Sequence, residues 1–319
     1  MPKIGVVYGT ETSFPSAVVD RINAKRVPGV LAEHLCLGGV RMAEPCGYAV
    51  IIDRISHDIE FYRAYLKNAA ISGTIVLNNP FWWSADNKFF DCALASRLGV
   101  AIPNTAILPQ KTHPPGTTVQ SMRNLRFPLN WDEIFEYTGF PAFLKPLDEI
   151  GSWKHIYEVQ SPEAFFAAYD QTGSLCMMLQ SAVKFEACFR CYVVGQEKVR
   201  VVKYDPKLPH HMRYARNGTS ISSELHDRMV NDARILCRAL GYDINMVEFA
   251  VEKGVPYAID VLNPAPEGNI HLIGEANFEW LVENVAELAI ARASAEGAPS
   301  SRWDYFLKDY FPKTKRASI

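Results

Sequence analysis

Three basic residues stand in sequence settings from which a side chain could bind a phosphate. Lys145 ends an apolar run, so a buried strand would bring its ammonium to a loop, and Lys88 stands at an expected helix start. Arg190 lies inside a strand-like run of apolar and aromatic residues. A lysine binds phosphate as a compact charge and an arginine as a planar fork. Each residue also has a structural alternative, because a solvated or paired charge would leave the same pattern.

A short connection at Gly195-Gln196 predicts that the strand of Arg190 folds back as an antiparallel hairpin. Across a two-residue turn, Arg190 and Lys203 would share one face and form a patch suited to phosphate oxygens, unless both are paired surface charges. Gly151 and Ser152 form a small pair in a polar loop, where backbone N–H groups could approach a phosphate. A tight turn is the alternative interpretation of that loop.

Two acidic residues and an asparagine occur in neighbouring strand-like segments in the last third of the chain. Glu248 lies within an apolar run, and Asp260 ends the next run, with Asn263 following it. Burying a carboxylate costs several kcal/mol unless the group is paired or bound to a metal. Oxygen ligands of this kind suit a Mg²⁺ ion shared with phosphates. The alternative is neutralisation by nearby arginine or lysine side chains, and the sequence leaves both readings open.

Strands and helices must position these residues, and hydrophobic periodicity predicts an alternating order. Early in the chain, strands are expected at 4–8, 48–52 and 74–78, and helices at 16–22, 58–70 and 87–98. Such alternation is typical of a parallel sheet covered on both faces. Farther along, we expect strands at 142–145, 175–180, 246–251 and 256–262, helices at 162–169 and 227–240, and a long polar loop at 205–223.

Composition excludes several classes of function. The 33 Lys and Arg against 35 Asp and Glu give a formal charge of −2, so no overall basic field exists to hold nucleic acid. Apolar residues make up 48% of the chain, enough for sizeable cores, yet no apolar run reaches the roughly 20 residues that span a bilayer. Seven scattered cysteines and the lack of an apolar leader predict a reducing compartment, so we expect a cytoplasmic protein of about two domains.

Taken in order along the chain, these pieces resemble the ATP-grasp superfamily, and most closely its amino-acid and peptide ligases such as the ribosomal-protein glutamate ligases. The resemblance covers roughly residues 53–268. The matching segments are the stretch from Val76 to Lys88, the entry from Gly99 to Thr105, the lysine strand from Gly139 to Pro146, the flap start at Gly151-Ser152, the hinge from Met178 to Val183, the position of Arg190, and the two strands that carry Glu248 and Asp260.

This resemblance implies both an architecture and a set of ligand-binding residues. It implies an α/β and α+β protein with a parallel α/β pre-ATP-grasp domain at 1–104, a small ATP-grasp subdomain with a flap loop at 105–183, and a C-terminal subdomain with a metal site at 184–319. The residues expected to hold ATP are Lys88, Lys145, Gly151, Ser152, Gln180, Ser181, Val183, Glu186 and Lys203. Those expected to hold Mg²⁺, or Mn²⁺ in its place, are Glu248, Asp260 and Asn263.

Two positions depart from the pattern of the superfamily. The acidic residue and the asparagine are separated by one residue more than usual, so Asp260 and Asn263 would point to opposite sides of a regular strand. A bulge or a turn after Leu262 is therefore expected to re-aim Asn263. The hinge has Ser181 where an acidic residue is common, so adenine recognition would depend more on backbone groups.

The implied activity is the ATP-dependent joining of a carboxylate to an amine through an acylphosphate, with release of ADP and phosphate. Arg190 would stabilise the transferred phosphoryl group, and Arg213, with Arg216 as the alternative, would bind the substrate carboxylate. The loops 148–154 and 205–223 would close over the intermediate. The expected partners are small-molecule carboxylates and amines, including amino acids or peptides, with no nucleic acid and no membrane, and a homo-oligomer stays open. Two alternatives remain, a small-molecule kinase and a nucleotide-binding protein without catalysis.

Overall fold

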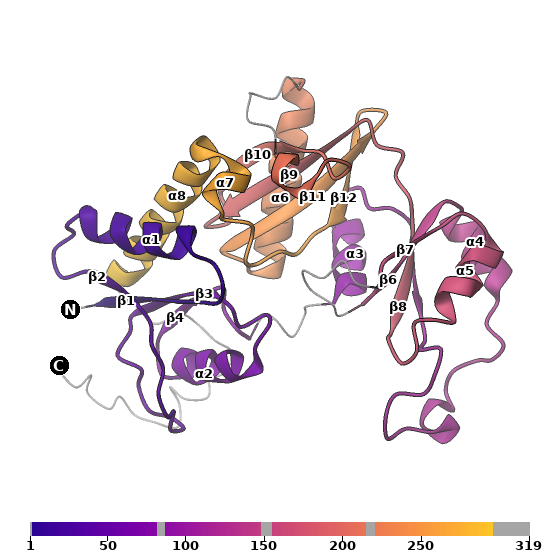
Figure 1. Cartoon of the computed structure of the whole chain (residues 1–319), viewed down its shortest axis with the longest axis horizontal. Coiled ribbons are helices and arrows are strands. Elements are labelled where there is room, and N and C mark those ends of the chain that lie inside the picture. Colours follow the sequence, from indigo (N-terminus) through magenta and orange to yellow (C-terminus); the bar gives the residue numbers. More distant parts are fainter. Residues whose placement is uncertain (1, 82–86, 148–154, 215–220, 296–319) are drawn as a thin grey trace.

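The chain folds around three sheets of four strands each, which Figure 1 shows from one side. In this computed structural model the described residues are 2–81, 87–147, 155–214 and 221–295. One sheet is parallel and the other two are antiparallel. The predicted fold class, α/β and α+β with a parallel α/β unit at the N-terminal side, is confirmed. Within the described ranges, no helix combines the length and the apolar character needed to cross a bilayer.

The parallel sheet has the strand order β2-β1-β3-β4 and is covered on both faces. Its elements are β1 (Lys3–Tyr8), α1 (Ser13–Ala24), β2 (Leu31–His34), β3 (Val50–Arg54), α2 (Glu60–Ile71) and β4 (Ile75–Leu77). Ile4 and Val6 enter the core that α1 closes, whereas Val7 and Ile51 enter the core that α2 closes. Because both faces are covered, successive residues must be apolar, and β3 is buried throughout.

The smaller antiparallel sheet has the order β5-β8-β6-β7. Its elements are β5 (Thr105–Leu108), α4 (Trp131–Thr138), β6 (Ala142–Pro146), β7 (Tyr157–Val159), α5 (Pro162–Tyr169) and β8 (Met177–Ser181). Ala142 and Leu144 are buried in the core that α4 and α5 cover, where Trp131 and Phe165 also pack. The alternate residues of β6 are only half-buried, so this strand presents Lys145 on the opposite face of the sheet.

The larger antiparallel sheet has the order β10-β9-β11-β12. Its elements are β9 (Ala187–Val194), β10 (Lys198–Tyr204), α6 (Ser223–Leu240), β11 (Ile244–Glu252), β12 (Val255–Asp260), α7 (Ile270–Ile273) and α8 (Glu275–Ser294). The helix α6 closes one core of this sheet, and α8 closes the other together with α1. The helix α3 (Lys88–Arg97) lies between the two antiparallel sheets, as Figure 1 shows, and its Ala95 joins the core under α6.

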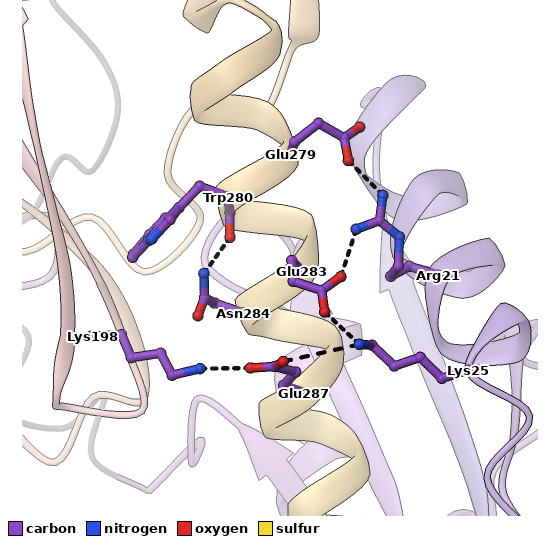
Figure 2. Close-up of polar contacts among 8 residues, drawn as sticks. All are labelled: Arg21, Lys25, Lys198, Glu279, Trp280, Glu283, Asn284 and Glu287. Carbon is purple, nitrogen blue, oxygen red and sulfur yellow. Dashed lines mark hydrogen bonds and ion pairs between the residues drawn. The ribbon is translucent and has the colours of Figure 1, made fainter. Parts of the chain in front are cut away.

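A row of ion pairs joins α8 to the parallel unit (Figure 2). Arg21 of α1 contacts Glu279 at 2.5 Å and Glu283 at 2.6 Å, and Lys25 contacts Glu283 as well. Lys25 and Arg21 together lower the pKa of Glu283 to about 2. Because these side chains are partly exposed, each pair contributes little to stability alone, and the row mainly fixes how α1 and α8 lie against each other.

Two helices begin earlier than the sequence pattern predicts. The first helix starts at Ser13 rather than near Ser16, so Pro15 lies within its first turn, a position where its missing N–H causes no loss. The helix α6 starts at Ser223 because Ser222 caps it, accepting a hydrogen bond from the N–H of Leu225 at 3.2 Å. A side-chain cap therefore marks the start of α6, whereas α1 begins without one.

Candidate functional site

A pocket opens where α3 and the two antiparallel sheets approach one another. The residues that line it are Lys88, Asp91, Cys92, Lys145, Met178, Ile259, Asp260 and Val261. They come from α3, from the neighbouring strands β6 and β8, and from the end of β12. The structure therefore brings Lys88, Lys145 and Asp260 to one place, although the chain separates them widely.

Lys145 enters this pocket from the smaller antiparallel sheet. Its partner across the β6–β8 ladder is Met178, so the two side chains lie on the pocket face of that sheet. The ammonium Nζ donates a hydrogen bond to the carbonyl of Ile259 at 3.3 Å, which crosses to the other sheet. Burial lowers the pKa of Lys145, and the nearby carboxylate of Asp260 only partly offsets this effect. An anion in the pocket would supply the negative charge that this ammonium lacks.

Lys88 reaches the same pocket as the first residue of α3. The side chain of Asn87 caps this helix by accepting hydrogen bonds from the N–H groups of Phe89 and Phe90 at 3.1 and 3.0 Å. The capped helix start adds its partial positive charge to that of Lys88. Lys88 is also close enough to Lys145 to contribute to the lowered pKa of that residue. Two cations and a helix N-terminus therefore face the pocket together.

The larger antiparallel sheet contributes a buried ion pair next to the pocket. Glu248 of β11 lies directly opposite Arg190 of β9, and Nε of Arg190 donates to Glu248 at 2.9 Å. The guanidinium lies 3.6 Å from the ring centroid of Tyr204 and donates to the hydroxyl of Tyr214. Burial raises the pKa of Glu248, and the carboxylate of Asp260 raises it further against the opposing effect of Arg190.

Glu248 and Asp260 form an opposed carboxylate pair across the β11–β12 ladder. The register pairs them directly and then shifts between Glu248 and Phe249, so the bulge lies at Ile259, before Asp260 rather than after Leu262 as the sequence suggested. Asp260 is exposed toward the pocket, whereas only 5% of Glu248 is exposed. Opposed residues have Cβ atoms about 5 Å apart, which allows two carboxylates to share one cation.

The segment after Asp260 leaves the ladder and is held by Asn245. The amide of Asn245 donates to the carbonyl of Val261 at 2.9 Å, and its oxygen accepts from the N–H of Asn263 at 2.8 Å. The N–H of Met246 in β11 also donates to the carbonyl of Asn263 at 3.1 Å, so both backbone and side-chain groups of β11 hold this segment. Within the described residues, no three acidic, His or Cys side chains form a metal cluster, so a third protein ligand would have to be an amide such as that of Asn263. The opposed carboxylates of Glu248 and Asp260 are oxygen ligands of the kind that Mg²⁺ prefers, and the role of Asn263 as a third ligand stays a prediction.

The expected pairing of Arg190 with Lys203 on one face is wrong. The β9–β10 register places Lys203 opposite Phe189 and Val202 opposite Arg190. The strands end at Val194 and begin again at Lys198, so three residues form the turn instead of two. A shift of one residue moves every side chain to the other face of a strand. Lys203 is therefore exposed on the face away from Arg190.

The predicted hinge residues mostly have partners within the protein. Gln180 is buried and donates to the hydroxyl of Thr105 at 2.8 Å, and the hydroxyl of Ser181 donates to the carbonyl of Thr138 at 2.5 Å. Val183 is half-buried, and Glu186 is exposed and accepts a hydrogen bond from a backbone N–H of the β11–β12 turn at 3.2 Å. That adenine is bound by backbone groups of this hinge stays a prediction.

Arg213, the expected carboxylate-binding residue, is also engaged. Its Nε donates to the carbonyl of Leu208 at 2.9 Å and its Nη1 donates to the hydroxyl of Tyr204 at 3.2 Å. Gly151, Ser152 and Arg216 lie outside the described residues. A role of Arg213 in binding a substrate therefore stays a prediction.

Asp91 and Cys92 also line the pocket, although neither was predicted as a site residue. Both lie on α3, three and four positions after Lys88. Residues three and four apart share one face of a helix, so the expected position of Lys88 was enough to find them. Cys92 accepts a hydrogen bond from Gln180 at 3.6 Å, and burial raises the pKa of its thiol. It is therefore a packing residue of the pocket wall rather than a nucleophile.

No family model matches the chain, and no curated protein matches its sequence. Solved structures match over nearly all of it. The ATP-grasp ligase PsnB complexed with a minimal precursor aligns with a TM-score of 0.62 and 15% identity, over 91% of this chain and 99% of that protein. A RimK domain ATP-grasp protein from Sphaerobacter thermophilus aligns with a TM-score of 0.63 and 13% identity, over 90% of this chain and 99% of that protein. The chain has the ATP-grasp fold.

A third structure with this fold matches equally well. The D-alanine–D-alanine ligase from Bacillus anthracis complexed with ATP aligns with a TM-score of 0.63 and 15% identity, over 93% of this chain and 99% of the ligase. The ATP-grasp fold confirms the fold class that the motif order predicted, and the domain limits at 104 and 183 stay predictions. At this level of identity the likeness concerns the fold, and the chemistry must be argued from the residues of the pocket.

Proposed function

We propose that this protein is an ATP-dependent ligase that joins a carboxylate to an amine. The observation that carries the proposal is the convergence of Lys88, Lys145 and Asp260 on one pocket between the antiparallel sheets, with Glu248 directly opposite Asp260 beside it. Lysine side chains with a helix N-terminus suit the phosphates of ATP, and the carboxylates suit the cation that accompanies them. A pocket that served only to pack the two sheets together would not collect four charged groups.

In this proposal the protein holds magnesium and the triphosphate with residues of both sheets. Glu248, Asp260 and Asn263 would bind Mg²⁺, which neutralises phosphate charge when bound. Lys145 and Lys88 would bind phosphate oxygens from the opposite side. Charges fixed before the reaction stabilise a developing charge without reorganisation, which is the main source of catalysis in phosphoryl transfer.

The reaction would proceed in two steps whose atoms balance. A carboxylate oxygen of the substrate attacks the γ-phosphorus, and the bond to ADP breaks, giving an acylphosphate. The amine nitrogen of the second substrate then attacks the carbonyl carbon, phosphate leaves, and the nitrogen loses a proton to form the amide. Arg190 lies beside Glu248, where its guanidinium could stabilise the transferred phosphoryl group.

The structural neighbours suggest a class of substrate. PsnB was solved with a precursor peptide, and the other ligase is named for joining two D-alanine molecules. We therefore propose an amino acid or a peptide as carboxylate and amine donors. Cytoplasmic location and homo-oligomer formation stay predictions.

Release of ADP from purified full-length protein tests the proposal. Mixtures of carboxylates and amines are incubated with Mg·ATP, and products are identified by mass spectrometry. We expect substrate-dependent ADP release with an amide product, and we expect Lys145→Ala to lose it, whereas Lys67→Ala, at an exposed lysine of α2, keeps it. ADP with a stable phosphoester would instead indicate a kinase. Nucleotide binding without turnover of any mixture would indicate a binding protein.

A further inference from the structure

Side chains from the parallel unit contact the chain on both sides of the β11–β12 hairpin that carries the carboxylates. At one end, the side chain of Asn78 is buried after β4 and forms two hydrogen bonds with Ile244, the first residue of β11. Its amide donates to the carbonyl at 2.6 Å and its oxygen accepts from the N–H at 2.7 Å. The start of the hairpin is therefore fixed by a residue more than 160 positions earlier in the chain.

Arg54, the last residue of β3, contacts the segment that follows the hairpin after Asp260. Its Nη2 donates to the carbonyl of Pro266 at 2.6 Å, and its Nε donates to Glu11 at 2.8 Å. The side chain is 0% exposed, and the guanidinium lies 4.7 Å from the ring centroid of Phe14. Its direction is therefore fixed by an ion pair, an aromatic ring and a backbone carbonyl at once.

The segment that follows Asn263 is stiff enough to transmit this contact. Pro264 and Pro266 have fixed φ angles, which reduces the freedom of the chain between Asn263 and the Arg54 contact. Asn263 is held at the other side of this segment, because its carbonyl accepts from the N–H of Met246 at 3.1 Å and its N–H donates to Asn245 at 2.8 Å. A few residues further on, Phe14 packs so closely on Gly268 that an added Cβ would lie 2.8 Å from it. The segment therefore has little freedom on the side of the parallel sheet.

The burial of Arg54 carries an energetic cost that the fold alone does not require. Its Nη1 has no hydrogen-bond partner within the described residues. Apolar residues of similar size often replace a buried ion pair with no loss of stability. Unlike an apolar residue, an arginine at this position can donate a hydrogen bond that holds the carbonyl oxygen of Pro266 in place.

We propose that Arg54 is a positioning residue of the metal site. By holding the carbonyl of Pro266 it keeps the segment after Asp260, and with it Asn263, in the geometry that binds Mg²⁺ together with the nucleotide. This inference rests on the proposed function, since it assigns a role toward the metal of that same pocket. It also gives the parallel unit a part in the chemistry beyond packing against α8.

The test compares Arg54→Met with Arg54→Lys and with a control in the same interface. The control is Arg21→Met, which removes the ion pairs of Arg21 with Glu279 and Glu283 between α1 and α8 and leaves the contact of Arg54 with Pro266 in place. The measurement is the Mg²⁺ dependence of ADP binding by calorimetry on the full chain, with ADP release as a second readout. Unfolding in urea is recorded for each variant.

For Arg54→Met we expect the Mg²⁺ concentration that gives half-maximal ADP binding to rise about 10- to 100-fold, as for other residues that orient metal ligands. Arg54→Lys can still donate to Pro266, so it should restore part of the affinity. Arg21→Met should leave the Mg²⁺ dependence within twofold of wild type. A Mg²⁺ dependence equal to wild type in Arg54→Met would overturn the inference. If Arg54→Met does not fold, Arg54→Lys is measured in its place, and a Mg²⁺ dependence equal to wild type in that variant would also overturn the inference. Wild-type protein that binds no ADP at any Mg²⁺ concentration would instead refute the proposed function.

Discussion

The two antiparallel sheets bring their charged residues to the pocket in different ways. The smaller sheet presents Lys145, whose ammonium donates, among the described residues, one hydrogen bond at 3.3 Å to a carbonyl of the other sheet and whose pKa is lowered by burial. The larger sheet presents Arg190, which is held by Glu248, by the hydroxyl of Tyr214 and by the face of Tyr204. Among the described residues, Lys145 therefore has fewer contacts that offset its charge than Arg190 has.

This difference indicates which side of the pocket depends on its ligand. Burial with little compensation raises the energy of a charged group, and an incoming anion recovers that energy. Lys145 is therefore the residue whose state an incoming nucleotide would change most. Arg190 and Glu248 are arranged before any ligand arrives, so they contribute a preorganised wall and stabilise the sheet itself. Three predictions test this comparison.

The largest effect is expected on stability, from Arg190→Met. This change leaves the carboxylate of Glu248 buried without its partner, so we expect the free energy of unfolding to fall by about 3–5 kcal/mol. Urea denaturation followed by circular dichroism measures this. The double variant with Glu248→Leu serves as the control, because removing both charges should recover most of the loss. A loss below about 1 kcal/mol in the single variant would show that the Arg190–Glu248 pair does not stabilise the larger sheet.

A smaller effect is expected on nucleotide binding as the pH rises. Lys145 is charged below its pKa and neutral above it, and that pKa is lowered in the folded protein. Affinity for ADP should therefore begin to fall at a pH below the value of about 10.4 at which an ordinary lysine loses its proton, by up to about tenfold. Calorimetric titration between neutral and alkaline pH measures it.

Lys145→Arg is the matched control for the pH effect. Arginine stays charged throughout this range, so the variant should bind ADP with little pH dependence between neutral and alkaline conditions. The same alkaline loss in the variant as in wild type would assign the effect to another group.

The smallest effect is expected from Lys203→Ala. This lysine was predicted to share a face with Arg190, but the register places it on the other side of the sheet. We therefore expect its removal to change ADP affinity and the free energy of unfolding by less than about 0.5 kcal/mol, as for an exposed residue. A tenfold loss of ADP affinity would show that the three-residue turn is not the one the protein adopts in solution.

The sequence alone determined the classes of element and several of the residues that face the pocket. Apolar runs and capping residues predicted the alternation that forms the parallel sheet, and the apolar run before Lys145 placed it at a strand end. The polar residue Glu248 in an otherwise apolar strand was informative because burying a carboxylate is costly. These features are local, so a short window of sequence contains them.

Only the tertiary structure decided which side chains meet. One extra residue in the turn after Val194 separated Lys203 from Arg190, because strand faces alternate with every residue. The contacts of Arg54 with Pro266 and of Asn78 with Ile244 join segments more than 160 positions apart. Hydrophobic periodicity cannot predict these long-range contacts, because they depend on how whole sheets pack against one another. The local sequence therefore determined the residue types in each element, and the packing of the sheets determined which of these residues are in contact.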